Sequence, residues 1–169
     1  IKMKKLTVSL IITTYNWPEA LLLVLKSVEF QSIKPNEVII ADDGSGKETA
    51  LAIKKFLKKT KLKIIHSWQE DVGYRLSMSR NKAIAKSKCK YIVMIDGDMI
   101  LHPNFIEDHI NFAKQGTFVQ GVRAKIDDAK SKEILRSGSI LFKKLDKGLK
   151  SKRYSIRNKL LSFLFSGKK

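Results

Sequence analysis

The sequence predicts an α/β fold in which helices cover both faces of a mostly parallel sheet. Apolar segments of five to eight residues, rich in β-branched side chains, alternate with amphipathic segments of helical period. Acidic or polar groups follow several of the apolar segments, where strands of such folds end. With 169 residues and 43% hydrophobic content, the chain can bury a core without cross-links.

The first predicted strand spans residues 6–13, an apolar run too short for a buried helix. A helix over residues 18–31 follows it. Asn16 with Glu19 three positions later resembles a capping box, and Pro18 stands in the first turn, where its missing N–H costs nothing.

The second unit pairs a buried strand at residues 37–41 with a helix at residues 47–60, separated by an acidic, glycine-containing turn. The helix is amphipathic, with its lysines predicted to face solvent. The side chains predicted to face inward are Leu51, Ile53, Phe56 and Leu57.

Two further strands are predicted at residues 62–67 and 90–95, and helices at 77–86 and 105–113, followed by a last strand at 117–121. Strands that alternate with helices in this way form βαβ units with right-handed crossovers.

The pattern weakens beyond that point, so we expect a first domain at residues 1–121 and a basic extension at 122–169. Residues 134–142 suggest an irregular strand or hairpin. Of the formal net charge of +18, the extension holds 15 basic and 4 acidic residues. Its segment 150–165 is predicted to be a helix whose apolar stripe is buried against protein or lies on an anionic membrane.

Compartment signals favour the cytoplasm. Cys89 is the single cysteine, which excludes an internal disulfide framework. No apolar run reaches the ~20 residues of a membrane span, and the basic start lacks a signal-peptide core. We therefore expect a cytoplasmic protein, with peripheral contact to the inner face of the cell membrane as a further option.

Parallel strands bring their following loops to one edge of the sheet, so residues 13–16, 42–45 and 96–98 should meet in one crevice. Asp96 and Asp98 can converge on one point, because Gly97 lets the backbone turn between them. Hard oxygen ligands of this kind suit Mg²⁺ or Mn²⁺, particularly when substrate phosphates complete the coordination. The alternative is a plain acidic turn.

Asp42 and Asp43 can bind a nucleobase or ribose, or cap the helix that follows, and we assign Asp43 to the ligand. Tyr15 can stack on a base or fill a half-buried loop.

Arg75 and Arg80 flank a predicted helix start, where guanidinium groups can bind a diphosphate. Their alternative is surface pairing with Glu70 or Asp71.

Five segments occur in an order that resembles the inverting family-2 glycosyltransferases, above all bacterial enzymes of lipopolysaccharide and capsule synthesis with a galactosyltransferase-like second half. The resemblance covers about residues 6–122. The segments are Val8-Ser-Leu-Ile-Ile-Thr-Thr-Tyr-Asn16, Ile39-Ile-Ala-Asp-Asp-Gly-Ser45, Gln69-Glu-Asp-Val-Gly-Tyr-Arg75, Arg80-Asn81 and Ile95-Asp-Gly-Asp98.

The resemblance implies a GT-A (Rossmann-like) fold, a nucleotide-sugar donor that is usually UDP-linked, and Mn²⁺ or Mg²⁺ as cofactor. By position, it implies metal binding by Asp98 together with Asp96, which also lies near the ribose. The donor-binding residues implied or proposed are Thr13, Tyr15, Asn16, Asp42, Asp43, Arg75, Arg80, Asp96 and Gly97.

The sequence departs from this family after residue 121. Inversion needs a carboxylate base, and no later segment matches the family's base-bearing motif, so the catalytic base is unknown. Asp127, Asp128 and Glu133 come too early and are expected to solvate a loop. We expect the donor-binding half of a hexosyltransferase, with an incomplete acceptor half and poor turnover on its glycan or lipid-linked acceptor.

Two other functions fit parts of the sequence. The positive charge permits a nucleic-acid-binding module, but the basic tail lacks interleaved aromatic residues, and acidic strand ends would repel phosphate without a metal. A sugar-phosphate nucleotidyltransferase would share the sheet and the metal. Such enzymes have a glycine-rich basic loop after the first strand, where this chain has Thr13-Thr-Tyr-Asn-Trp-Pro18.

Overall fold

A computed structural model describes residues 6–142 and 146–150 of the chain. These residues form two compact units, one that ends at Val119 and one that begins at Gln120. No helix in the described ranges combines the length and the apolar character that a bilayer-spanning segment needs.

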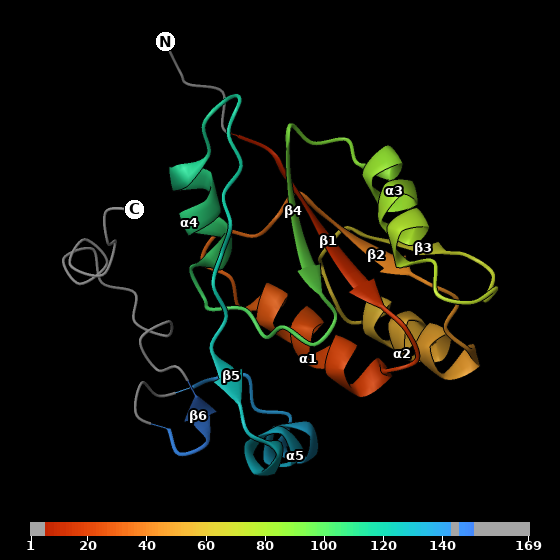
Figure 1. Ribbon diagram of the computed structural model, residues 1–169, viewed down its shortest axis with the longest axis vertical. Coiled ribbons are helices and arrows are strands. Elements are labelled where there is room, and N and C mark those ends of the chain that lie inside the picture. The colour runs from red at the N-terminus through yellow and green to blue at the C-terminus, as the bar shows by residue number, and fades with distance from the viewer. Residues whose placement is uncertain (1–5, 143–145, 151–169) are drawn as a thin grey trace. The chain divides into compact units, whose positions relative to one another are not determined.

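The first unit is built on four parallel strands in the order β3-β2-β1-β4 (Figure 1). This arrangement confirms the predicted parallel α/β fold. The strands are β1 Val8–Thr14, β2 Glu37–Asp42, β3 Ile64–Trp68 and β4 Tyr91–Asp96; the helices are α1 Pro18–Glu29, α2 Lys47–Leu57, α3 Leu76–Lys86 and α4 Phe105–Phe112.

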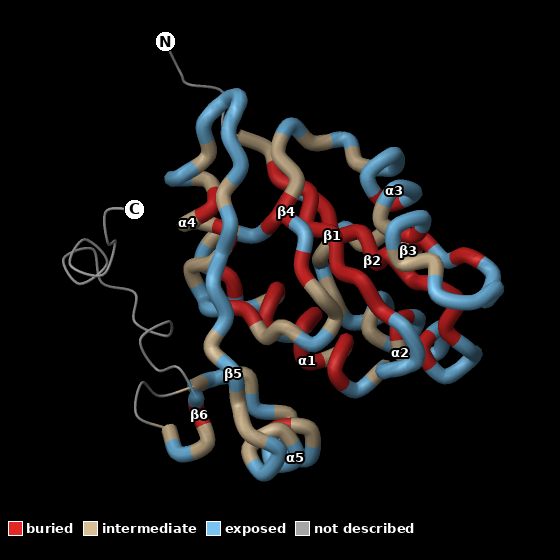
Figure 2. Tube along the Cα trace, in the orientation of Figure 1, coloured by how far each residue is buried: buried red, intermediate tan, exposed pale blue. Residues whose placement is uncertain are grey.

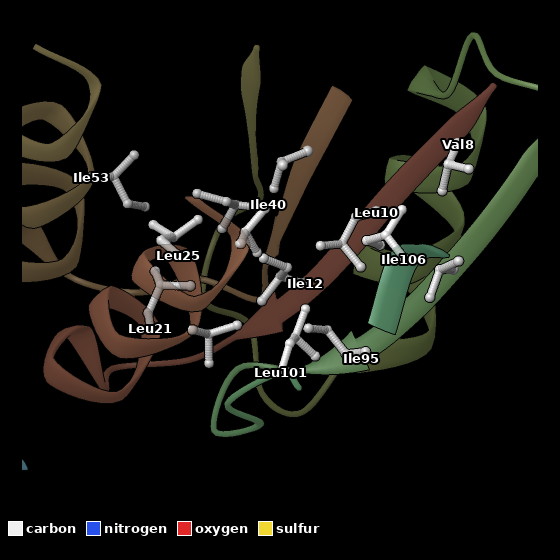
Figure 3. Close-up of a cluster of buried hydrophobic side chains, with 14 residues drawn as sticks. Val8, Leu10, Ile12, Leu21, Leu25, Ile40, Ile53, Ile95, Leu101 and Ile106 are labelled. Atoms are coloured by element: carbon white, nitrogen blue, oxygen red, sulfur yellow. The ribbon is translucent and has the colours of Figure 1, made fainter. Parts of the chain in front are cut away.

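Helices cover both faces of the sheet, which explains why β1 and β2 are apolar without alternation. Leu10 and Ile12 of β1 pack on one face against α1, α2 and α4, as the side chains in Figure 3 show. Ile11 and Ile39 point to the other face, where Ala83 of α3 covers them. Both strands are therefore buried along their whole length (Figure 2).

The strand order reverses at β1, and this reversal determines where a ligand can enter. The chain passes from β1 to β2 and β3 on one side, and then returns to place β4 on the other side of β1. In register, Thr13 of β1 lies beside Asp96 of β4, and Thr14 lies beside Asp42 of β2. Such a reversal opens a crevice at the carboxyl ends of the strands.

The second unit corrects two predictions. Residues 134–142 form no strand or hairpin, because residues 134–137 complete helix α5, Asp128–Ser137. Asp127, expected in a loop, caps that helix by accepting a hydrogen bond from the Lys130 N–H at 2.8 Å. Gly138 ends it with φ +68°. A short antiparallel pair, β5 Lys125–Ile126 and β6 Leu149–Lys150, completes the unit.

Of two other predicted elements, one is not formed and the other lies almost wholly outside the described residues. Residues 117–121 form no strand, because a short apolar run needs a neighbouring strand for its hydrogen bonds and none pairs with it in the described ranges. The helix predicted at residues 150–165 falls almost wholly outside the described residues, which end at Lys150 in β6.

The cap of helix α1 and the packing of helix α2 differ from the predictions. Asn16 and Glu19 form no capping box: Trp17 occupies the N-cap position, and the side-chain Oδ1 of Asn16 accepts from the Gly46 N–H at 2.8 Å. On α2, Ile53 is buried, but Leu51 and Leu57 are 55% and 41% exposed. Only one side of α2 faces the core, because the helix lies at the flank of α1.

Candidate functional site

A cavity of about 740 Å³ lies at the carboxyl ends of the strands in the first unit, within the size range of small-molecule sites. Its lining comes from the ends of three strands, from the loop before α3 and from α3 itself. The lining residues are Thr13, Thr14, Tyr15, Trp17, Asp43, Asp71, Gly73, Tyr74, Leu76, Arg80, Asp96, Gly97 and Asp98.

The two carboxylates of the Asp96-Gly97-Asp98 turn both line this cavity. Position 97 must be glycine, because a Cβ there would collide with the carbonyl oxygen of Thr13. The close approach holds the turn against the end of β1. Asp98 is exposed, while the side chain of Asp96 is 46% exposed.

Arg80 lines the cavity from helix α3 and reaches Asp96. Its Nη2 atom donates to Asp96 Oδ1 at 2.9 Å, and the Thr13 hydroxyl donates to the same oxygen at 3.3 Å. The predicted alternative partners of Arg80, Glu70 and Asp71, are therefore replaced by a carboxylate of the site. A guanidinium group at this position can also bind phosphate oxygens.

Asp42 and Asp43 have separate roles, and Asp43 is the one that lines the cavity. The expected cap of helix α2 by the other carboxylate is not formed, because the helix has no side-chain cap at its N-cap residue, Gly46. Asp42 is 1% exposed; its Oδ2 lies 2.8 Å from His66 Nε2, and its Oδ1 accepts from the Ser45 N–H at 2.8 Å. Burial opposes ionisation, but the hydrogen bonds from His66 and Ser45 outweigh it and hold the pKa of Asp42 below its usual range. Asp42 is not among the lining residues.

Asp43 lines the cavity and also fixes the loop that follows β3. Its Oδ1 accepts from Gln69 Nε2 at 2.5 Å, and its Oδ2 accepts from the Arg75 N–H at 2.9 Å. Its carboxylate therefore links the end of β2 to the start of α3. Gln69 is almost completely buried. Sequence reasoning did not single out Gln69, whose partner lies 26 residues away.

The loop of residues 69–75 forms one wall of the cavity. Gly44, at φ +99°, allows this wall to approach, because a Cβ there would lie 2.6 Å from Asp71 Cα. The Tyr15 hydroxyl donates to Asp71 Oδ2 at 3.0 Å. That hydrogen bond and the nearby charge of Asp71 raise the pKa of Tyr15.

Six lining residues were missed as candidates: Thr14, Trp17, Asp71, Gly73, Tyr74 and Leu76. Trp17 and Tyr74 are large side chains in polar loops, and Tyr74 is 88% exposed. For these two residues, an exposed aromatic side chain in a loop was the signal that could have indicated them.

Seven of the predicted site residues line the cavity, and three do not. The lining set is Thr13, Tyr15, Asp43, Arg80, Asp96, Gly97 and Asp98. Outside it, Asn16 contacts Gly46, Asp42 contacts His66, and the Arg75 guanidinium donates to the Glu70 carbonyl oxygen. The roles predicted for these three residues stay predictions.

The residues at the end of β4 fit a divalent cation that takes part of its coordination from a ligand. In the described ranges no group of three or more His, Cys, Asp or Glu side chains could enclose a metal. Asp96 and Asp98 offer hard oxygen donors, and Mg²⁺ sites often use one or two carboxylates together with substrate phosphates and water. The donor set is therefore suited to a cation bound jointly with a phosphorylated ligand.

Comparisons with known proteins show the family to which the chain is similar. The sequence pattern of "Glycosyl transferase family 2" matches residues 9–166. Chondroitin synthase of Escherichia coli is 30% identical over 125 residues, which are 72% of this chain and 18% of that protein. The poly(ribitol-phosphate) β-N-acetylglucosaminyltransferase TarP of Staphylococcus aureus is 35% identical over 117 residues, 67% of this chain and 34% of TarP.

Among solved structures, S. aureus TarS 1–349 in complex with UDP-GlcNAc is 25% identical, with a TM-score of 0.52; the match covers 63% of this chain and 30% of that one. The chain spans 10–34% of the length of hyaluronan synthase of Pasteurella multocida, chondroitin synthase and TarP.

Proposed function

Because the chain belongs to glycosyl transferase family 2, we propose that its cavity binds a UDP-linked sugar together with a divalent cation, as the donor site of an inverting hexosyl transfer. The observation that carries this proposal is the convergence of Asp96, Asp98 and Arg80 on one cavity. S. aureus TarS, which has been solved with UDP and with UDP-GlcNAc, supports the choice of nucleotide.

In this proposal Asp98 and Asp96 hold Mn²⁺ or Mg²⁺. The cation would stabilise the charge that develops on the leaving diphosphate. Arg80 already lies 2.9 Å from Asp96, so its guanidinium can bind a phosphate oxygen beside the same carboxylate. In the same proposal, Tyr15 and Asp43, which also line the cavity, contact the nucleoside.

The acceptor in this proposal is a glycan or a lipid-linked glycan of a cell-surface polysaccharide. Inversion requires a base that removes the acceptor hydroxyl proton on the face opposite the leaving group. None of the described carboxylates is assigned to that role. We expect nucleotide binding by this chain to be strong relative to its turnover.

Calorimetric titration with UDP, GDP and CDP, each with and without Mn²⁺, tests the proposal. We expect UDP to bind best, and to bind more tightly with Mn²⁺. Asp98→Ala should lose the gain from Mn²⁺, about 100-fold if the carboxylate is a direct ligand. The control Glu29→Gln removes one carboxylate from the last turn of α1 and should bind like the wild type. Equal affinity for the three nucleotides, or indifference to Mn²⁺, would contradict the proposal.

A further inference from the structure

The outer side of helix α2 carries an apolar residue surrounded by lysines. Leu51 lies in the middle of this side, and lysines occupy the positions four before, three after, four after and seven after it. On an α-helix, positions three and four apart are neighbours, and the position seven after lies on the same side two turns further along. We call Leu51, Lys47, Lys54, Lys55 and Lys58 the α2 face.

The side chains of the α2 face are turned to solvent. Leu51 is 55% exposed, and all four lysines are exposed. The opposite side of the helix holds Ile53, which is 2% exposed and packs into the core with α1 (Figure 3). The orientation of the α2 face is therefore determined by core packing, and its exposure is a property of the folded unit.

Positive charge is concentrated here more than elsewhere in the first unit. Residues 47–63 contain seven of the sixteen basic residues between positions 6 and 119, and Glu48 is the single acidic residue among them. Lys63 is paired with Glu37. In the described ranges none of the four lysines of the α2 face has a carboxylate partner within ion-pair distance.

We propose that the α2 face binds the anionic surface of a lipid bilayer, with Leu51 in the apolar boundary and the lysines at the headgroup phosphates. A helix that combines an apolar centre with flanking lysines suits a bilayer interface, where both features contribute to binding. This proposal is independent of the donor site, because no residue of the α2 face lines the cavity.

Nucleic acid is the other polyanion that lysines attract, and the composition of the α2 face disfavours it. The face has no arginine for bidentate phosphate binding and no aromatic side chain for base stacking. An exposed leucine in its centre contributes nothing to phosphate contacts, whereas it gains from entering a lipid interface.

Co-sedimentation of the full chain with phosphatidylcholine vesicles that contain about a third phosphatidylglycerol tests the proposal. The triple variant Lys54→Gln/Lys55→Gln/Lys58→Gln should bind about 100-fold more weakly, since each lysine at an anionic surface contributes about fivefold. The matched control Lys82→Gln/Lys86→Gln/Lys90→Gln removes equal charge from exposed positions on and beyond α3, on the opposite sheet face. It should lose at most about fivefold.

Leu51→Gln separates lipid from nucleic acid. It should weaken vesicle binding about fivefold while leaving the affinity for a DNA duplex unchanged. Residues 150–169 are identical in all variants, so differences between variants report the α2 face. Equal losses in the two triple variants would overturn the proposal, as would vesicle binding that is insensitive to Leu51→Gln and to the α2 triple variant. Circular dichroism confirms that each variant is folded.

Discussion

The two edges of the central sheet use carboxylates in opposite ways. At the amino-terminal edge, Glu37 is 1% exposed and accepts three hydrogen bonds, from Ser9 Oγ at 2.7 Å, Lys63 Nζ at 2.9 Å and the Lys88 N–H at 2.8 Å. At the carboxyl edge, Asp98 is exposed at the rim of a cavity. One carboxylate is fully committed to protein partners, and the other is accessible to a ligand.

This difference predicts which carboxylates stabilise the fold and which are available to bind a ligand. A buried carboxylate whose hydrogen bonds are all made within the protein stabilises the fold, and its removal leaves donors without partners. A carboxylate at a cavity contributes little to folding and keeps its oxygens for a ligand. Substitution of Glu37 should therefore act on the free energy of unfolding, and substitution of an accessible cavity carboxylate such as Asp98 should act on affinity.

Glu37→Gln should have the largest effect on stability. The variant loses the charge that three donors surround, and we expect the free energy of unfolding to fall by about 3 kcal/mol. Urea denaturation measures this change, and nucleotide titration should show unaltered affinity. Lys63→Met removes only the 59% exposed partner and should cost less than about 1 kcal/mol. Equal costs for the two variants would contradict this account of the amino edge.

The same carboxylate predicts how stability depends on pH. Burial alone would raise the pKa of Glu37, but hydrogen bonds from Lys88, Lys63 and Ser9 lower it from 4.5 to about 2. Because the folded-state pKa is the lower one, this contribution is fully present above about pH 4.5 and is lost as the pH falls toward 2. Glu37→Gln should flatten the stability curve in that window; an unchanged slope would show that other carboxylates cause it.

Gly97→Ala should have an intermediate effect and should act on both properties. The new methyl group would collide with the carbonyl oxygen of Thr13, and overpacking of this kind costs about 2 kcal/mol. The turn must move to relieve the collision, which displaces Asp96 and Asp98, so UDP affinity with Mn²⁺ should fall at least about tenfold. Gly121→Ala, where a Cβ meets nothing within 4 Å, is the control and should change neither quantity.

Much of the fold follows from local sequence patterns. The four parallel strands and the helices between them were predicted within one to three residues at most ends, because each strand is a continuous apolar run bounded by polar turns. The errors came where partners distant in sequence decide. Asn16 matched a local capping pattern, but it accepts a hydrogen bond from Gly46, which becomes its neighbour only in the folded sheet.

In the candidate site, too, contacts between residues distant in sequence could not be predicted from local patterns. That the ends of β1, β2 and β4 meet follows from parallel topology, so the gathering of Thr13, Asp43 and Asp96 was predictable. The assignment of Asp43 to the cavity was also correct, but the buried contact between Asp42 and His66 was not foreseen, because no local pattern connects these two residues. Hydrogen-bond partners across a sheet are determined by register, which a single sequence does not reveal.

Arg80→Gln should have the smallest effect on stability and still reduce binding. The Arg80–Asp96 pair is partly exposed on both sides, at 36% and 46%, so its loss should change the free energy of unfolding by no more than about 0.5 kcal/mol. At the cavity, however, the variant removes the cation beside the carboxylates, and UDP affinity should fall about tenfold.

Lys86→Gln, an exposed change in the last turn of the same helix, is the matched control for Arg80→Gln and should alter neither quantity. A fall in stability comparable with that of Glu37→Gln would mean that the carboxyl edge, too, is committed to folding. Unaltered UDP affinity in Arg80→Gln would place the diphosphate elsewhere in the cavity. A loss of affinity without a loss of stability is the outcome that distinguishes a ligand-binding edge from a structural one.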